Sequence, residues 1–276
     1  MFRALFLFLL LLAVSGPGWA DEAWAGRVLH ACEDEEGYPP FTFPGGGGHA
    51  VGFSVDLIDE ALAGTGMRLD VAFLPTVRCN ASVDNGSMDL SMEDFWDPDF
   101  ATRWRPTDAI YDGTFVLYYD RSRHPDGLVL ADVLAHPDQH RGCGLLGEIY
   151  DDFPPGQIDG REHLYAEVFE RVLTGACEFY PDLLEFGAAY RLNGRRLLKD
   201  GRIGYVVYPL PSRPGQPQRY DAGDKQPLYL YLRHDFPEGD ALIARVNDTV
   251  ARWRRTGKTA EVMARYVDLR PFTTAP

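Results

Sequence analysis

The sequence predicts an α/β protein made of two lobes of like architecture, joined by a hinge that the chain crosses twice and separated by a ligand cleft. Residues 27–92 alternate between strand and helix patterns, which indicates a parallel, wound sheet. A unit of helix end, glycine and apolar strand occurs at residues 83–88 and recurs at 198–203. This recurrence favours two similar lobes over one long sheet.

Residues 1–20 have the features of a secretion signal. Arg3 supplies a positive charge, and residues 5–14 form an apolar run. In residues 18–20 (G-W-A), Gly18 and Ala20 are the small residues at positions −3 and −1 of a cleavage site. The apolar run is short for a membrane span, although an uncleaved anchor is the alternative. We therefore expect a mature chain that begins at Asp21 and works outside the cytoplasm.

Composition limits the classes of partner. The chain has 41 acidic and 27 basic residues and a formal net charge of −14. Such a protein repels nucleic acid and anionic membrane surfaces, so we expect neither as a partner. Residues 21–276 are enough for one large domain or for two lobes of ordinary size.

The predicted elements of the first lobe follow in order. We expect a strand at 27–32, then a Pro-rich aromatic turn and a glycine-rich hairpin tip at 45–48. Apolar residues at helical spacing predict a helix at 54–63, with Ser54 as its N-cap. Strands are expected at 69–74 and 88–92, with a short helix between them at 78–84. The aromatic turn thus lies at the carboxyl end of a strand, where open α/β sheets bind ligands.

The second half of the chain predicts a second lobe and a return to the first. Strands are expected at 115–120, 143–146 and 203–208, and a Pro/Gly-rich loop at 209–217. An amphipathic helix is expected at 238–255, ended by Gly257, with another helix at 259–267. The predicted division is residues 1–20 as signal peptide, 21–114 plus 215–276 as lobe 1, and 115–214 as lobe 2.

Four cysteines, Cys32, Cys79, Cys143 and Cys177, are an even number in a chain that we expect in an oxidising compartment. They indicate two disulfides, for which three pairings exist. There is no C-x-x-C and no Cys/His cluster at zinc spacing, so we expect no metal. The glycine run at 45–48 lacks the Lys-Ser/Thr of a P-loop, and no G-x-S-x-G elbow occurs. We expect neither a cofactor nor a catalytic residue.

Several motifs resemble those of the family 3 extracellular solute-binding proteins, the amino-acid-type periplasmic binding proteins of bacterial uptake systems. Residues 38–41 (Y-P-P-F) resemble the opening motif of the family, residues 52–57 its G-F-x-V-D-L, and residues 84–89 its x-x-G-x-x-D step. The resemblance covers most of 25–120 and 200–267, and 121–199 only loosely. It implies the type II periplasmic-binding-protein fold.

This resemblance also implies a function. We expect a periplasmic monomer that captures a small polar molecule, amino-acid-like or cationic, for an ABC transporter or a sensor. Arg78-Cys79 resembles a branch of the family in which the cysteine of the second helix pairs with one on the first strand. The resemblance therefore implies a Cys32–Cys79 disulfide in lobe 1, which leaves Cys143 with Cys177 in lobe 2.

The resemblance implies a ligand site between the lobes. An aromatic of the first motif, Tyr38, would stack on the ligand; packing on lobe 1 is its alternative. In the family, an arginine after the third strand binds the carboxylate of the ligand, and Arg103 lies nearest to that position in this chain. The alternatives are that Arg105 has this role or that the two arginines are a solvated surface pair. The family also has an acidic residue in lobe 2 that binds the ammonium group of the ligand. The corresponding position in this chain falls near Tyr208, where there is no carboxylate.

Two segments depart from the family pattern. Residues 93–96 (E-D-F-W) favour a cationic, polyhydroxylated or planar ligand; a solvated acidic loop is the alternative. In lobe 2, Gly147 would let backbone N–H groups approach a ligand. The residues expected at the ligand site are Tyr38, Glu93, Asp94, Phe95, Trp96, Arg103, Gly147, Glu148 and Tyr150.

Two other functions stay open on the same fold. One is an enzyme similar to a cyclohexadienyl dehydratase, in which Glu93, Asp94 or Glu148 acts as general acid. The other is an accessory protein of an exported oxidoreductase that keeps the fold and has lost the ligand site.

Overall fold

The computed structural model describes residues 24–199, 201–209 and 225–273. The predicted signal peptide, the predicted mature N-terminus at Asp21 and all but the first residue of the loop predicted at 209–217 lie outside this part of the chain. Within it, no helix is both long and apolar enough to span a membrane.

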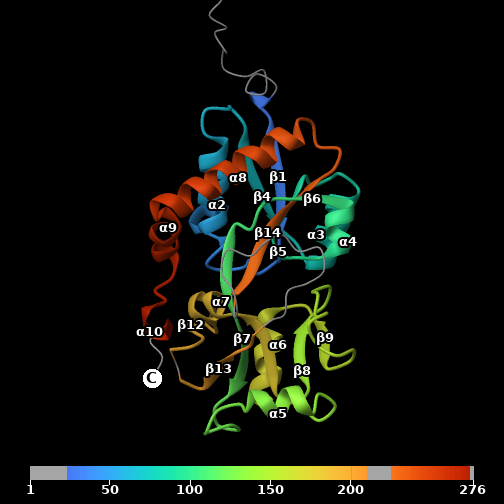
Figure 1. Ribbon diagram of the computed structural model, residues 1–276, viewed down its shortest axis with the longest axis vertical. Coiled ribbons are helices and arrows are strands. Elements are labelled where there is room, and N and C mark those ends of the chain that lie inside the picture. The colour runs from blue at the N-terminus through green and yellow to red at the C-terminus, as the bar shows by residue number, and fades with distance from the viewer. Residues whose placement is uncertain (1–23, 200, 210–224, 274–276) are drawn as a thin grey trace, which may run out of the picture.

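Two α/β lobes lie one above the other along the long axis of the molecule (Figure 1). One sheet runs through both lobes, and two strands beside this path join it, β13 (Ile203–Val207) on β7 and β6 (Trp104–Pro106) on β14. The order of the other strands is β4 (Arg68–Phe73), β1 (Val28–Glu33), β5 (Leu90–Phe95), β14 (Lys225–Arg233), β7 (Tyr111–Asp120), β10 (Phe179–Leu183), β8 (Gly142–Leu145) and β9 (Ile158–Glu162).

Lobe 1 contains the parallel sheet that the sequence predicts. Strand β1 lies between β4 and β5 and is parallel to both. Helices α2 (Phe53–Leu62), α8 (Gly239–Thr256) and α9 (Lys258–Tyr266) pack together on one side of this sheet, and α3 (Thr76–Asp84) and α4 (Pro98–Arg103) lie on the other (Figure 1). Gly257 ends α8 in the left-handed conformation, as predicted.

Lobe 2 is built around the far half of β7, which pairs antiparallel with both β10 and β13. Its core is aromatic, because Phe179 of β10 and Tyr118 of β7 pack with rings from the helices. The helices are α5 (Leu130–Ala135), α6 (Tyr165–Thr174) and α7 (Leu184–Ala189), and a small hairpin follows them, β11 (Arg191–Leu192) with β12 (Arg195–Arg196). The C-terminal helix of the described chain is α10 (Arg270–Thr273).

The hinge consists of β7 and β14. These strands are hydrogen-bonded to each other where they pass between the lobes, with Lys225 opposite Thr114 and Leu228 opposite Tyr111. The strand predicted at 115–120 is confirmed as part of β7, which pairs there with β10. We propose that the lobe boundary lies at residues 114/115, inside β7; the other predicted boundary, 214/215, lies outside the described residues.

Details of the first lobe differ from the prediction. Ser54 is not an N-cap, because α2 begins at Phe53 and Ser54 is buried in its first turn. The preceding residue, Gly52, has a φ of 140°, and a Cβ atom there would lie 1.9 Å from the carbonyl oxygen of Phe41. Only glycine fits this junction. The predicted hairpin tip is confirmed, with β2 (Phe43–Pro44) paired to β3 (Ala50–Val51) around a turn, η1, at Gly46–Gly48.

The structure contains both disulfides that the resemblance implied. Cys32 of β1 is bonded to Cys79 of α3, with Cα atoms 5.6 Å apart. Cys143 of β8 is bonded to Cys177, just ahead of β10, with Cα atoms 5.7 Å apart. Each disulfide therefore joins two elements of one lobe, and neither restricts the movement of one lobe against the other.

Candidate functional site

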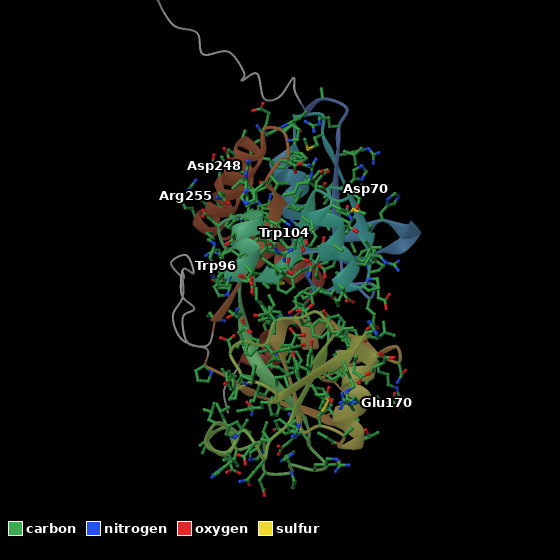
Figure 2. All side chains as sticks on the ribbon, turned by 90° about the vertical axis from the view of Figure 1, so that its right-hand side faces the viewer. Asp70, Trp96, Trp104, Glu170, Asp248 and Arg255 are labelled. Carbon is green, nitrogen blue, oxygen red and sulfur yellow. A yellow bond between two sulfur atoms is a disulfide. The ribbon has the colours of Figure 1, made fainter. Side chains whose placement is uncertain are left out.

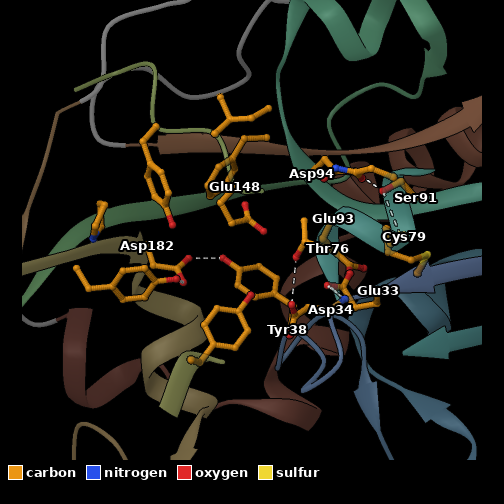
Figure 3. Close-up of a pocket in the computed structure, with 18 of the residues that line it drawn as sticks. Glu33, Asp34, Tyr38, Thr76, Cys79, Ser91, Glu93, Asp94, Glu148 and Asp182 are labelled. Atoms are coloured by element: carbon orange, nitrogen blue, oxygen red, sulfur yellow. Dashed lines mark hydrogen bonds between the residues drawn. The ribbon is translucent and has the colours of Figure 1, made fainter. Parts of the chain in front are cut away.

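A cavity lies between the lobes, where the carboxyl ends of strands from both lobes meet (Figure 3). Strands β1 and β5 end there from lobe 1, and β8 and β10 from lobe 2. Its volume is about 60 Å³. The position agrees with the general rule for ligand sites in α/β proteins.

Seven carboxyl side chains from both lobes line this cavity. Among the described residues, its lining contains no lysine, arginine or histidine. The carboxyl residues are Glu33, Asp34, Glu93, Asp94, Glu148, Asp152 and Asp182, and the aromatic residues are Tyr38, Phe95, Phe115, Tyr150, Phe153, Tyr165 and Tyr180. The site is thus strongly acidic, with rings in its walls.

A β-bulge brings two neighbouring carboxyl groups to the cavity. Successive residues of a regular strand point to opposite faces, yet Glu93 and Asp94 of β5 both line the site. The pairing of β5 with β14 shifts between Tyr229 and Tyr231, and Glu93 has a positive φ of 30°. A non-glycine residue in this conformation stores strain of about 1–3 kcal/mol, which is typical of functional sites.

Glu33 and Glu93 form a buried carboxyl pair. Burial and the neighbouring carboxyl of Glu93 raise the pKa of Glu33 well above its usual range, and burial also raises the pKa of Glu93. Oε1 of Glu93 accepts a 2.8 Å hydrogen bond from Thr42, and Oε1 of Glu33 accepts one from the backbone N–H of Asp34. The two carboxyl groups are hydrogen-bonded to each other, and the Ser54 hydroxyl also interacts with Glu93.

Asp34 and Thr76 connect β1 to the first turn of α3. The Thr76 hydroxyl donates a 3.1 Å hydrogen bond to Oδ2 of Asp34 (Figure 3), and the backbone N–H of Glu36 donates to Oδ1. A carboxylate at a helix N-terminus is stabilised by the helix dipole and by the unpaired N–H groups. Burial nevertheless raises the pKa of Asp34 to about 6.

Asp94 of lobe 1 and Glu148 of lobe 2 are half-buried carboxyl groups of the lining, as is Asp152. Burial raises the pKa of Asp94 to about 7, although Ser91 donates a 2.5 Å hydrogen bond to its Oδ2. Burial raises the pKa of Glu148 to about 8, with the negative charges of Asp94, Asp34 and Asp182 adding to the effect. Glu148 is therefore the centre of the acidic cluster.

Asp182 joins the two lobes through Tyr38. The Tyr38 hydroxyl donates a 2.5 Å hydrogen bond to its Oδ1 (Figure 3), and Tyr180 donates a 2.6 Å bond to its Oδ2. Burial raises the pKa of Asp182 to about 6, against the effect of these hydrogen bonds. The Tyr38 ring stacks on Phe186 of α7, with centroids 5.0 Å apart. Tyr38 also stacks on Phe41 of lobe 1, with centroids 5.5 Å apart, so the packing on lobe 1 that was the alternative from the sequence is present together with packing on lobe 2.

A second contact between the lobes lies beside Tyr38. Glu36, in the loop after β1, accepts a 3.1 Å hydrogen bond from the Tyr190 hydroxyl and a 3.4 Å bond from the backbone N–H of Ala166. Ala166 is in the first turn of α6, where a carboxylate is favourable. The loop after β1 therefore holds lobe 2 at this edge of the cleft.

The structure brings six of the predicted site residues to the cavity and leaves three outside. The six that line it are Tyr38, Glu93, Asp94, Phe95, Glu148 and Tyr150. Trp96 instead packs edge-on against Tyr229 inside lobe 1, and Figure 2 shows it in the upper lobe with Trp104. The ring lies behind the site because the strand continues to Phe95, beyond its predicted end at residue 92.

The predicted arginines also lie elsewhere. Arg103 makes hydrogen bonds of 2.6 and 2.5 Å to the two carboxylate oxygens of Asp84 and lies 4.5 Å over the ring of Trp104. Arg105 pairs with Asp240 at 3.2 Å. Neither lines the cavity.

Gly147 faces the other lobe and not the cavity. It has a φ of 95°, and a Cβ atom there would lie 2.8 Å from Cγ2 of Val77 in α3. Its role in the structure is to allow the lobes to approach, whereas the sequence analysis expected it to face a ligand.

Sequence reasoning missed several cavity residues. Glu33 and Asp34 directly follow the strand predicted at 27–32, so the rule that ligands bind at carboxyl ends of strands would have found them. Asp182 gives no such signal, because its strand is five residues long and contains Pro181. Across the described residues, no group of three or more His, Cys, Asp or Glu side chains is arranged to hold a metal ion.

Two lobes, two crossing strands and a cavity between the lobes define a protein of the type II periplasmic-binding-protein fold. The chain belongs to the bacterial extracellular solute-binding proteins, family 3, whose family model matches residues 32–268. Proteins of this family are extracellular or periplasmic and bind small solutes. A search of curated proteins found no significant match.

Solved structures show the same fold at low sequence identity. An amino acid ABC transporter substrate-binding protein from Streptococcus pneumoniae Canada MDR_19A, bound to L-arginine, is 14% identical, with a TM-score of 0.66 over 90% of this chain and 97% of that one. The ancestral amino acid-binding protein AncCDT-1, a precursor of cyclohexadienyl dehydratase, is 16% identical, with a TM-score of 0.64 over 87% and 96%. A histidine kinase sensor domain is 16% identical, with a TM-score of 0.61 over 87% and 96%.

Proposed function

We propose that this protein is a periplasmic solute-binding protein that captures a small, polar, positively charged molecule between its lobes. The observation that carries the proposal is the charge of the cavity: seven carboxyl groups and, among the described residues, no basic side chain. A cation replaces the protons that these groups hold and balances charges that would otherwise repel each other. The aromatic walls suit an organic cation, because rings attract cations and pack against methylene groups.

The partner in this proposal is a membrane transporter or sensor that recognises the closed protein. The match to the solute-binding family supports such a role, and the similar structures include a transporter component and a sensor domain. The signal-like residues 1–20 and two disulfides support a location in the periplasm, where disulfides persist. We expect the protein to be a monomer.

An enzyme on the same fold is a second candidate. Burial raises the pKa of Glu148 to about 8, so this carboxyl holds a proton at neutral pH, as a general acid must. The substrate of a cyclohexadienyl dehydratase is itself an acid, however, and the described lining offers no basic group to balance its charge. The acidic cavity therefore favours capture of a cation over this reaction.

Thermal unfolding of the mature protein with different solutes tests the proposal. Putrescine, agmatine and arginine serve as cations, glucose as a neutral solute and citrate as an anion. A bound ligand at a hundred times its Kd stabilises the folded protein by about 2.7 kcal/mol. We therefore expect the melting temperature to rise with one or more of the cations and to stay unchanged with glucose and citrate. Stabilisation by citrate or glucose alone would contradict the proposal, and no shift with any solute would favour the accessory protein.

Two variants make the test specific to the cavity. Glu148→Gln should weaken the effect of the cation, because it removes a central charge of the site. Glu35→Gln makes the same change at an exposed position beside Glu33 that does not line the cavity. The second variant should respond like the unmodified protein.

A further inference from the structure

We propose that the ligand is an organic amine or guanidine without a carboxylate group, as opposed to an amino acid. This inference rests on the proposed capture of a cation and adds what the cation must lack. It follows from where the chain places its own carboxyl groups and its own basic side chains.

The helix N-terminus nearest the cavity already holds an anion. Asp34 accepts a hydrogen bond from Thr76, the first residue of α3, and its carboxyl group is buried. The carboxylate of an amino acid at this position would meet the like charge of Asp34 with no counter-charge. The chain thus fills with its own side chain the place where a ligand carboxylate would be stabilised.

No described basic side chain is available inside the cavity for a ligand carboxylate. Arg103 is held by both oxygens of Asp84 on the surface of lobe 1, and Arg105 is paired with Asp240. Lys225 lies on the hinge strand β14 and donates a 2.8 Å hydrogen bond to Thr114. Burial of an unpaired carboxylate among other carboxyl groups is strongly unfavourable, so the charge of the described lining disfavours an α-amino acid.

The facing carboxyl groups of Glu33 and Glu93 are a site for a positive group. Glu33 and Glu93 are 9% and 7% exposed, both line the cavity, and their carboxyl groups are hydrogen-bonded to each other. An ammonium or guanidinium group that donates to both carboxylates would replace the proton that holds this pair together. The strained backbone of Glu93 holds its carboxyl at this point, which is a second sign of a built site.

A second positive group would meet the carboxyls of the opposite lobe. Glu148 and Asp182 belong to lobe 2, and Glu148 also lies within electrostatic reach of Asp94. Tyr150 and Phe95 add rings to the wall of the cavity, which suits a short methylene chain. The cavity is small, about 60 Å³, so the ligand class is short diamines and guanidino amines.

Pairs of compounds that differ by one carboxylate test the inference. Calorimetric titration at pH 8 compares putrescine with ornithine and agmatine with arginine. In each pair, we expect the compound without the carboxylate to bind at least about tenfold more tightly, a difference that one unpaired buried charge readily exceeds. Equal or tighter binding of the amino acid in both pairs would overturn the inference and leave cation capture intact.

Failure of cation capture itself gives a different result. If none of the four compounds binds while a neutral or anionic solute does, or if nothing binds, the proposed function and this inference are both overturned. The variant Asp34→Asn, checked for folding by circular dichroism, should reduce the preference for agmatine over arginine because it removes the competing charge at α3. If that variant does not fold, Glu148→Gln is used instead and should lower the affinity for agmatine at least about tenfold. Glu35→Gln should leave this affinity unchanged. Equal affinities of the unmodified protein and both variants would overturn the inference.

Discussion

The hydroxyl group of Tyr38 donates a 2.5 Å hydrogen bond to Oδ1 of Asp182, and this bond joins lobe 1 to lobe 2. The aromatic residue that the sequence analysis assigned to the ligand is thus also a contact between the lobes. Because Asp182 lines the cavity, the balance between open and closed lobes is coupled to the charge of the site.

Replacement of Tyr38 by phenylalanine should favour the open arrangement of the lobes. The ring keeps its packing on Phe186, but the hydrogen bond to Asp182 is lost, at a cost of about 1–3 kcal/mol for a charged acceptor. Small-angle scattering should show a larger radius of gyration. Tyr180→Phe is the matched control, because Tyr180 bonds the same carboxyl from within lobe 2. An equal expansion in both variants would contradict this role of Tyr38.

Gly147→Ala should also hold the lobes apart. The added Cβ atom would lie 2.8 Å from Cγ2 of Val77 across the cleft. Alanine is also strained at the φ of 95° that Gly147 adopts. Gly156→Ala carries a similar backbone cost at a φ of 81°, with no atom within 4 Å of the new Cβ. Cation affinity should fall only in the first variant. A similar loss in both would mean that backbone strain alone is responsible.

The stability of the ligand-free protein should fall as pH rises from about 5 to about 8. The pKa of Glu148 is raised to about 8 in the folded protein from 4.5. The folded state therefore keeps a proton that the unfolded chain releases, and its contribution is lost as pH rises through the folded pKa. Glu148→Gln should show a smaller loss of melting temperature over this range, whereas Glu35→Gln should keep the full loss. Identical pH slopes in both variants would count against the raised pKa.

Binding of a cation should become tighter over the same pH range. The carboxyls of Asp94 and Glu148, whose pKa values are raised to about 7 and about 8, must release protons before they balance a positive charge. The groups that face Glu148 are Asp34, Asp94 and Asp182, so no described basic side chain opposes this trend. Titration with agmatine should show an affinity gain of roughly tenfold between pH 6 and pH 8, with protons released to the buffer. An affinity independent of pH would contradict proton exchange.

Loss of the Cys32–Cys79 disulfide should affect both stability and binding. It closes a segment with a sequence separation of 47, which corresponds to about 4 kcal/mol of stabilisation in the chain-entropy description. Replacement of both residues by alanine should lower the free energy of unfolding, and cation affinity should also fall because both cysteines line the cavity. The pair Cys143 and Cys177 lies outside the lining, so its loss should reduce stability alone. Denaturant titration measures the stability and calorimetry the cation affinity. If loss of Cys143 and Cys177 lowered the affinity and loss of Cys32 and Cys79 did not, the placement of Cys32 and Cys79 at the binding site would be refuted.

Much of the fold could be predicted because its signals are local. Apolar periodicity located the strand at 27–32 and the helix at 238–255 to within one residue at each end, and glycines marked the ends of helices. Cysteine pairing came from family resemblance, because four cysteines allow three pairings by spacing alone. What the periodicity could not provide was the register of β14 against β5, which creates the bulge at Glu93.

The site was only partly predictable because contacts far apart in the sequence decide it. Glu93 and Glu148 were identified as departures from a known pattern, and both line the cavity. Arg103 was selected by its position in the chain, but Asp84 on a neighbouring helix holds it on the surface. Asp182 is 144 residues away from its partner Tyr38, and no local pattern connects the two.

The contacts of Glu36 with Tyr190 and Ala166 have a consequence for kinetics. They lie in the loop after β1, at the edge of the cleft beside Asp34 and Tyr38, and join the lobes without a solute. A solute must wait for these contacts to break, so at high solute concentration the association rate reaches a ceiling equal to the rate of opening. The lifetime of these two partly buried hydrogen bonds and of the Tyr38–Asp182 bond, and not the encounter frequency, would then limit how fast a solute enters.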